Sequence, residues 1–278
     1  FDFESFHMTD VWAPYLESGQ AMVFSIDTVD EETWSDFWGN AEWRIQRYEQ
    51  WICFITDELV RGEDGEIERL ELFAAAAEKK RVDAYEDILK KGGFRVKAVI
   101  PSQLAYARLI ANYNKQVPEH DPEQDIILVD IGHADVVVSL LHGSHYEASR
   151  VIDFGCNEID LAIADLHGID PYTAGRYKYS NFEGVLDTPE CQAVYDQLSI
   201  EINRVINYYN FDNPDKNIDQ LYFLGGGAQI PQLTDAIRES LSIPAGFITD
   251  LMPPEAREDE FTPACALAIG ALLEGEAM

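Results

Sequence analysis

The chain has 278 residues, of which 46% are hydrophobic, so it can bury a substantial core and is not a disordered chain. It holds 51 acidic against 20 basic residues, and a formal net charge of −31 disfavours nucleic-acid binding and direct electrostatic binding to anionic membranes. We interpret this acidity mainly as a source of solubility. No apolar run approaches the roughly 20 residues that span a bilayer, so we expect no direct membrane insertion.

The N-terminal part of the chain predicts strands and a long amphipathic helix. Strands are predicted at residues 21–26, 51–56 and 71–77, with a polar, glycine-rich run between the last two. The helix is predicted to begin at Asp30, and its buried stripe would consist of Trp34, Phe37, Trp38, Ala41, Ile45 and Tyr48.

A second helix is predicted over residues 79–91. Its apolar residues at helical spacing, which we expect to face inward, are Val82, Tyr85, Ile88 and Leu89. Gly92–Gly93 ends this helix, and a strand at 94–100 and a helix at 103–113 follow. The order strand, helix, two strands, helix and strand predicts a compact α+β unit over residues 17–100.

Residues 115–125 contain two prolines among polar and acidic side chains, which predicts a surface connection and a domain boundary. Beyond them the chain predicts three strands, a helix, a polar segment, a long helix, and then two strand–helix pairs. The ranges are 126–131, 136–141, 146–152, 157–166, 190–209, 221–224, 231–241, a short strand around Phe247, and 263–273. This order is that of a ribonuclease-H-like α/β domain.

Two glycine-containing turns are the strongest candidates for a phosphate-binding site. Asp130-Ile131-Gly132 ends a buried strand and leads through a turn to a second strand, where the Asp could hold a hydrated metal. Gly225-Gly226-Gly227 joins a buried strand to a helix, where a ligand could lie against the backbone. Ordinary tight turns without a ligand would give the same two patterns.

Three charged side chains are further candidates. Glu201 and Arg204 lie one helical turn apart, and an ordinary solvated ion pair within the helix is the simpler explanation for them. Lys178 stands between Tyr177 and Tyr179 in a segment that we expect to be a loop, where most lysines are simply exposed.

Taken in order, these pieces resemble the actin-like ATPases, and more closely the PilM family of type IV pilus assembly proteins. The resemblance runs from about residue 20 to the end and rests on residues 71–80, 92–98, 104–107, 201–209 and 223–228. It implies an α/β actin-like (ribonuclease-H-like) ATPase fold with a complete second half. In domains, it implies a 1C-like α+β domain at 17–93, a remnant strand and helix of the first actin-like domain at 94–115, and the second actin-like domain at 126–278.

The resemblance also implies a nucleotide-binding site. We assign no catalytic residue in it. ATP with Mg²⁺ would be held by Asp130, Gly132, Lys178, Glu201, Arg204, Gly225, Gly226 and Gly227, with Asp130 as the metal ligand.

Several departures from the family pattern weaken this site. Nothing before residue 120 matches the first phosphate hairpin, so we expect the chain to begin well inside the family pattern. Asp135 adds negative charge beside the second hairpin, and Ala174-Gly175-Arg176-Tyr177-Lys178 keeps the lysine but lacks the glutamate of the family's Ala-Glu-x-x-Lys stretch. We therefore expect ATP binding to be weak or lost in this chain, and any ATPase activity to be weak.

The function implied is that of a cytoplasmic scaffold for assembly of a type IV pilus, or of a related secretion or competence system. It would be recruited to the inner face of the membrane by binding the cytoplasmic N-terminal tail of a PilN-like protein through the unit at residues 17–100. Candidate walls for a peptide groove are Trp34, Trp38, Trp43 and Trp51, although ordinary core packing would also explain them. The alternatives are self-association, an FtsA-like cell-division protein, and a kinase or ATPase of the same superfamily.

Overall fold

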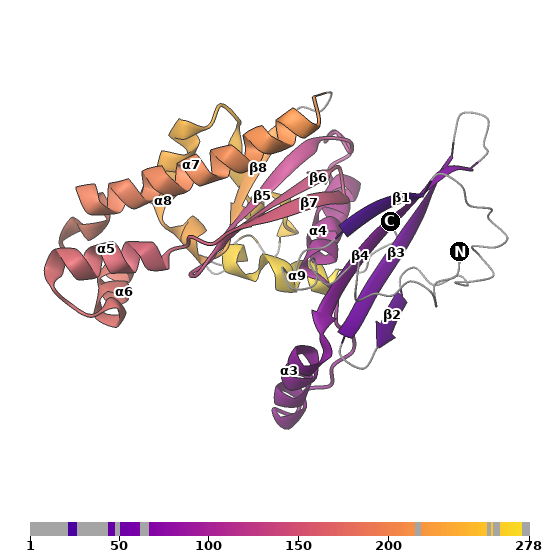
Figure 1. Cartoon of the computed structure of the whole chain (residues 1–278), viewed down its shortest axis with the longest axis horizontal. Coiled ribbons are helices and arrows are strands. Elements are labelled where there is room, and N and C mark those ends of the chain that lie inside the picture. The colour runs from indigo at the N-terminus through magenta and orange to yellow at the C-terminus, as the bar shows by residue number, and fades with distance from the viewer. Residues whose placement is uncertain are drawn as a thin grey trace. The chain divides into compact units, whose positions relative to one another are not determined.

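The computed structural model of the chain divides into two compact units (Figure 1), which are described separately: unit 1 comprises residues 1–105 and 274–278, and unit 2 comprises residues 106–273. The backbone is described for residues 22–26, 44–47, 51–61, 67–214, 218–254, 257 and 262–273. None of the helices in these ranges combines the length and the apolarity needed to cross a bilayer.

Unit 1 contains a four-stranded antiparallel sheet in the order β1-β4-β3-β2. The strands are β1 (Met22–Ile26), β2 (Arg44–Arg47), β3 (Trp51–Arg61) and β4 (Ile67–Glu78). The three strands predicted in this part of the chain are confirmed, and β3 and β4 are longer than expected. The sheet leaves β1 and β2 as its two edges, each paired on one side only with another described strand.

The helix predicted from Asp30 is wrong at its C-terminal end, because Ile45 lies in β2. Ile45 pairs with Phe54 of β3, and hydrogen bonding to the neighbouring strand outweighs the helical spacing of the apolar residues. The rest of the predicted stripe and the tryptophans at 34, 38 and 43 lie outside the described residues.

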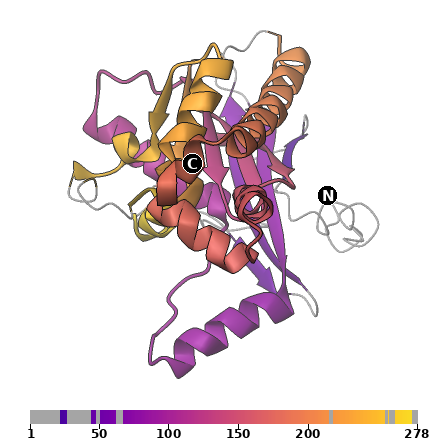
Figure 2. The ribbon, with the colours of Figure 1, turned by 90° about the vertical axis from the view of Figure 1, so that its left-hand side faces the viewer.

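The helix predicted at residues 79–91 is confirmed as α3 (Lys79–Lys91), and it ends at Gly92. The expected inward face is wrong, because only Val82 is buried while Tyr85, Ile88 and Leu89 are exposed. Figures 1 and 2 show α3 beyond the ends of β3 and β4, so the helix does not cover the face of their sheet. Val82 packs there on the small or half-buried side chains of Ala75, Ala77 and Val99.

The strand predicted at residues 94–100 is also wrong, since these residues have no regular secondary structure. None of the described strands pairs with them, and Gly92–Gly93 and Pro101 flank the segment. The helix predicted next is confirmed as α4 (Ser102–Gln116). The division between the two compact units falls within α4, between Ala105 and Tyr106.

Unit 2 is a mixed five-stranded sheet in the order β7-β6-β5-β8-β9, with helices on both faces. The strands are β5 (Asp125–Ile131), β6 (Val136–His142), β7 (His145–Ile152), β8 (Gln220–Leu224) and β9 (Ala245–Phe247). The α-helices after α4 are α5 (Asn157–His167), α6 (Pro171–Ser180), α7 (Pro189–Asp212), α8 (Pro231–Ser240) and α9 (Ala266–Leu272). Short 3₁₀ turns lie at Phe182–Asp187, Gly226–Gln229, Ile248–Leu251 and Thr262–Cys265.

The central strand β5 divides the core of unit 2 into two layers. Ile127, Val129 and Ile131 pack with α5, α7 and α8, whereas Ile126 and Leu128 pack with α4 and α9. This alternation follows from the two-residue period of a strand that is covered on both faces. Asp130 has the same parity as Ile126 and Leu128, so it faces the α4 side of the sheet.

Candidate functional site

Asp130 and the glycine loop lie side by side at the carboxyl ends of two parallel strands. Asp130 of β5 is opposite Leu224 of β8, and Gly225 follows directly. A Cβ atom on Gly225 would lie 2.4 Å from Oδ1 of Asp130, and φ of Gly225 is +83°. Asp130 and the glycine loop, which the resemblance assigns to one nucleotide site, therefore lie next to each other.

The carboxyl group of Asp130 is largely enclosed. The Tyr106 hydroxyl of α4 donates a 2.8 Å hydrogen bond to its Oδ2. Burial raises the pKa of Asp130 above its usual value; the Tyr106 hydrogen bond acts in the opposite direction, and the nearby charge of Asp135 raises the pKa further. The ionised carboxylate is thus less favourable in the folded chain than in the unfolded chain.

Asp130→Asn is expected to raise the free energy of unfolding at pH 7, because Asn keeps an acceptor for Tyr106 but removes the buried charge. The gain should vanish near pH 3, below the ordinary pKa of 3.8, where the aspartate is protonated in both states. Urea denaturation at the two pH values measures this difference, with Asp165→Asn, an exposed aspartate on α5, as the control. Lower stability of Asp130→Asn at pH 7 would contradict the expectation.

The hairpin turn after β5 is tied to the N-terminus of α5. The Gly132 amide donates to the Asp135 carbonyl at 3.0 Å, and the amides of Cys156 and Asn157 donate to the carbonyls of Gly132 and His133 at 3.0 and 2.8 Å. The first amides of α5 are therefore occupied by carbonyls of the turn, although free amides at a helix N-terminus would suit an anion.

The structure corrects the expected position of Lys178, which lies on α6 and not in a loop. The N-cap Asp170 accepts a 3.0 Å hydrogen bond from the Thr173 amide, and Pro171 follows as the first helical residue. This Asp-Pro start is a helix signal that could have been recognised in the sequence.

Lys178 is held in a buried ion pair. Its Nζ lies 2.8 Å from Oδ1 of Asp160 on α5 and donates a 3.0 Å hydrogen bond to the Cys156 carbonyl. The two side chains are only 15% and 9% exposed. Lys178 is thus a partner of α5, and Asp160 is a residue of the site that the sequence interpretation missed.

Gly227 brings the glycine loop against the same part of α5. A Cβ atom on Gly227 would lie 2.2 Å from Cγ2 of Ile131 and 2.7 Å from Sγ of Cys156, whereas one on Gly226 would meet nothing within 4 Å. Burial raises the pKa of the Cys156 thiol to about 11, so the thiol stays protonated at neutral pH. Asp130, Gly225, Gly227, Cys156 and Lys178 therefore form one connected cluster, which we call the hairpin cluster.

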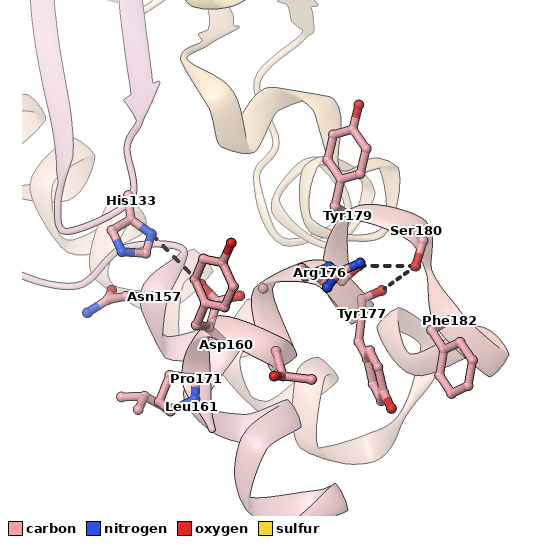
Figure 3. Close-up of a pocket in the computed structure, with 13 residues that line it drawn as sticks. His133, Asn157, Asp160, Leu161, Pro171, Arg176, Tyr177, Tyr179, Ser180 and Phe182 are labelled. Atoms are coloured by element: carbon pink, nitrogen blue, oxygen red, sulfur yellow. Dashed lines mark hydrogen bonds and ion pairs between the residues drawn. The ribbon is translucent and has the colours of Figure 1, made fainter. Parts of the chain in front are cut away.

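A concavity of about 920 Å³ opens beside this cluster, between α5, α6 and the hairpin turn (Figure 3). At one end Nδ1 of His133 lies 3.8 Å from Oδ2 of Asp160, and Oδ1 of Asn157 is buried without a hydrogen-bond partner among the described residues. Exposed aromatic rings of Tyr172 and Tyr179 lie along α6. The concavity thus has polar side chains at one end and aromatic rings along α6.

Glu201 and Arg204 lie away from this cluster on α7. Arg204 donates to Glu201 at 2.5 Å, and both line a separate concavity of about 740 Å³ next to β7. Arg150 of β7 stacks there over the Tyr208 ring, 5.5 Å from its centroid. The structure therefore brings six of the predicted residues, Asp130, Gly132, Lys178 and the three glycines, into one region and leaves these two outside it.

Within the part of the chain that the structure describes, no group of three or more His, Cys, Asp or Glu side chains is arranged to hold a metal ion. The role of Asp130 as a metal ligand stays a prediction.

Comparison with known proteins identifies the family. The family of type IV pilus assembly protein PilM matches residues 54–256, which is more than half of the chain. Among solved structures, the chain is similar to one of a PilM–PilN type IV pilus biogenesis complex, with a TM-score of 0.64 and 17% identity over 90% of this chain and 74% of that one.

Two other solved structures are similar to the chain. The ethanolamine utilization protein EutJ from Carboxydothermus hydrogenoformans matches with a TM-score of 0.52 and 17% identity, over 70% of this chain and 61% of that one. An archaeal actin homologue in complex with ADP matches with a TM-score of 0.44 and 16% identity, over 77% and 61% of the two chains. The predicted α/β actin-like fold is confirmed, and the chain belongs to the PilM family of type IV pilus assembly proteins.

Proposed function

We propose that this protein is a cytoplasmic scaffold of type IV pilus assembly that binds the N-terminal tail of a PilN-like membrane protein and is thereby recruited to the inner face of the membrane. The observation that carries the proposal is the family match, together with the likeness in fold to a PilM solved in complex with PilN. The actin-like fold here serves as a framework that positions a binding surface.

Unit 1 supplies an edge on which such a tail could bind. Its sheet ends in β1 and β2, whose outer backbone groups are unpaired with any described strand. An extended peptide can add to such an edge through main-chain hydrogen bonds, with alternate side chains as apolar anchors. A tail that carries basic residues beside its apolar motif would be attracted by the local excess of acidic residues, 19 against four basic ones over residues 1–78.

The residues of the hairpin cluster do not fit the phosphates of a magnesium-bound nucleotide. The first amides of α5 are occupied by carbonyls, Lys178 is paired with Asp160, and Asp130 and Asp135 add negative charge where phosphates would lie. We therefore propose a scaffold whose partner binding does not depend on nucleotide.

Calorimetric titration of the full chain with the synthetic N-terminal tail of the neighbouring pilus membrane protein tests the proposal. We expect one tail to bind per chain, with the same affinity in the presence and absence of Mg-ATP, and to weaken as salt rises because part of the attraction is electrostatic. Hydrogen exchange should show new protection in β1 or β2 when the tail is bound.

A scrambled tail of the same composition is the matched control and should not bind. If the native tail binds no better than the scrambled one, with or without nucleotide, the scaffold role through this partner is wrong. A tail that binds only with Mg-ATP would support the partner but contradict the independence from nucleotide.

A further inference from the structure

The positive charge of this acidic chain is concentrated on α3 and the residues that follow it. Residues 79–97 contain seven of the 20 basic residues and three acidic ones, so this segment carries +4 while the rest of the chain carries −35. The seven are Lys79, Lys80, Arg81, Lys90, Lys91, Arg95 and Lys97. A local positive charge of this size, in a chain that is otherwise strongly negative, indicates a surface for an anionic partner.

The charges on α3 are sorted by face. On one face, Lys79 pairs with Asp83 at 2.9 Å and Lys90 pairs with Glu86 at 2.8 Å, which neutralises both acidic residues. Lys80, Arg81 and Lys91 are exposed and have no ion-pair partner among the described residues. The third acidic residue, Asp87, lies near Lys80 and Lys91 on the helix. The three positive charges of Lys80, Arg81 and Lys91 exceed its single negative charge.

Large apolar side chains are exposed beside these free basic residues. Tyr85, Ile88 and Leu89 are 62%, 65% and 44% exposed, and their spacing of three and four residues places them on one face of α3. Phe94 is 68% exposed, and its amide donates a 2.9 Å hydrogen bond to the Leu89 carbonyl. The chain thus folds back at Gly92–Gly93 and sets the Phe94 ring at the end of the same helix.

The helical spacing interleaves the two kinds of side chain. At 100° per residue, Arg81 lies between Tyr85 and Ile88, and Lys80 and Lys91 lie next to Ile88 on its other side. We name this set the α3 surface; it consists of Lys80, Arg81, Tyr85, Ile88, Leu89, Lys91 and Phe94. α3 lies beyond the ends of its sheet (Figure 2), and all seven side chains are exposed, so the set lies on the convex outer surface of the helix and at its end.

We propose that the α3 surface docks on the anionic face of a lipid bilayer. Exposed aromatic and aliphatic side chains on a helix bordered by lysine and arginine enter the headgroup region while the basic groups attract anionic lipid. An acidic peptide would also suit the charge, but the interleaving of free basic and large apolar side chains on a convex face suits a planar boundary better than a narrow strand. This proposal goes beyond binding of the partner's tail and does not depend on it.

The net charge of the whole chain does not prevent such docking. At physiological ionic strength, charges separated by more than about 8 Å are largely screened from each other. A bilayer in contact with α3 therefore experiences mainly the local charge of +4 and little of the acidic remainder. The whole-chain charge predicts no membrane binding only because it averages over this uneven distribution.

Flotation of the full chain with vesicles, in the absence of the partner's tail, tests the proposal. We expect binding to phosphatidylcholine vesicles that contain about one third phosphatidylglycerol, weakening as salt rises, and no binding to phosphatidylcholine alone. The double variant Lys80→Gln/Lys91→Gln should bind about 25-fold more weakly, since each basic group at a membrane surface contributes about a factor of five. Ile88→Ser should also weaken binding, because it removes an apolar anchor.

Matched controls lie in unit 2. Arg150→Gln/Arg176→Gln removes two exposed positive charges, and Phe211→Ser removes a ring that is 83% exposed; neither should change vesicle binding. Tail binding should be unchanged in Lys80→Gln/Lys91→Gln, which separates this proposal from the partner interaction. No binding of the native chain to anionic vesicles, or equal losses in the test and control pairs, would overturn the proposal. Self-association or acidic-peptide binding that needs Lys80 and Lys91, without vesicle binding, would assign the α3 surface to that partner instead.

Discussion

Gly225→Ala is expected to destabilise unit 2 by about 3 kcal/mol or more, which corresponds to a fall in Tm of about 10 °C. Gly225 has φ +83° and ψ 178°, a backbone region that is almost exclusive to glycine and costs other residues about 1–3 kcal/mol. The added Cβ would also lie 2.4 Å from Oδ1 of Asp130 and 2.7 Å from the Ile131 carbonyl oxygen. Both effects act in the same direction, so the loop or β5 has to shift.

The glycine loop contains its own controls. Gly227→Ala should cost about 1–3 kcal/mol, because its Cβ would overlap Ile131 and Cys156 in a closely packed core. Gly226→Ala, for which the structure leaves open space, should change stability by less than about 1 kcal/mol. Thermal denaturation of the three variants measures the order. Equal effects at 225 and 226 would mean that the loop does not pack against β5 as described.

Lys178→Met is expected to lower the free energy of unfolding by about 3–5 kcal/mol, because it leaves Asp160 buried without its positive partner. The double variant Lys178→Met/Asp160→Asn should lose much less, since the unpaired charge is then removed as well. Urea denaturation of the two single variants and the double variant gives the coupling between the two side chains.

The exposed pair on α7 is the matched control for this prediction. Arg204→Met breaks a pair whose arginine is 68% exposed, and such helix pairs contribute only about 0.3–0.5 kcal/mol. A loss for Lys178→Met as small as that for Arg204→Met would show that the Lys178–Asp160 pair is not structurally important.

The sequence predicted unit 2 well because its core follows simple periods. The apolar run 126–131 and the helical stripe of α7 each identify an element that is covered by neighbours, and both elements are confirmed. The proximity of Asp130 and Gly225 could also be predicted, because each ends a strand of the same sheet. Residues that join different helices, such as Asp160 and Cys156, carry no local pattern and emerge only when α5 and α6 are packed together.

Unit 1 was harder to predict because its helix is not a core helix. Periodicity shows that Val82, Tyr85, Ile88 and Leu89 share a face of α3, but it does not show whether anything covers that face. Residues 44–47 illustrate the converse problem, because apolar residues at helical spacing predict a helix there, whereas pairing with β3 decides their conformation. The position of Lys178 has a local signal, because Asp170 and Pro171 together are typical of a helix start and predict a helix that contains Lys178.

The order of strands in unit 2 has a consequence for synthesis of the chain on the ribosome. β5, β6 and β7 can pair as soon as they emerge from the ribosome. β8, the other partner of β5, lies more than 90 residues further along the chain, as the pair Ile127 and Leu221 shows. At about 5–20 residues per second, the inner edge of β5 therefore remains open for several seconds while α5, α6 and α7 are made. That edge belongs to a strand whose residues Ile126 to Val129 are all apolar and buried in the folded chain, so the nascent chain is exposed to aggregation in this interval.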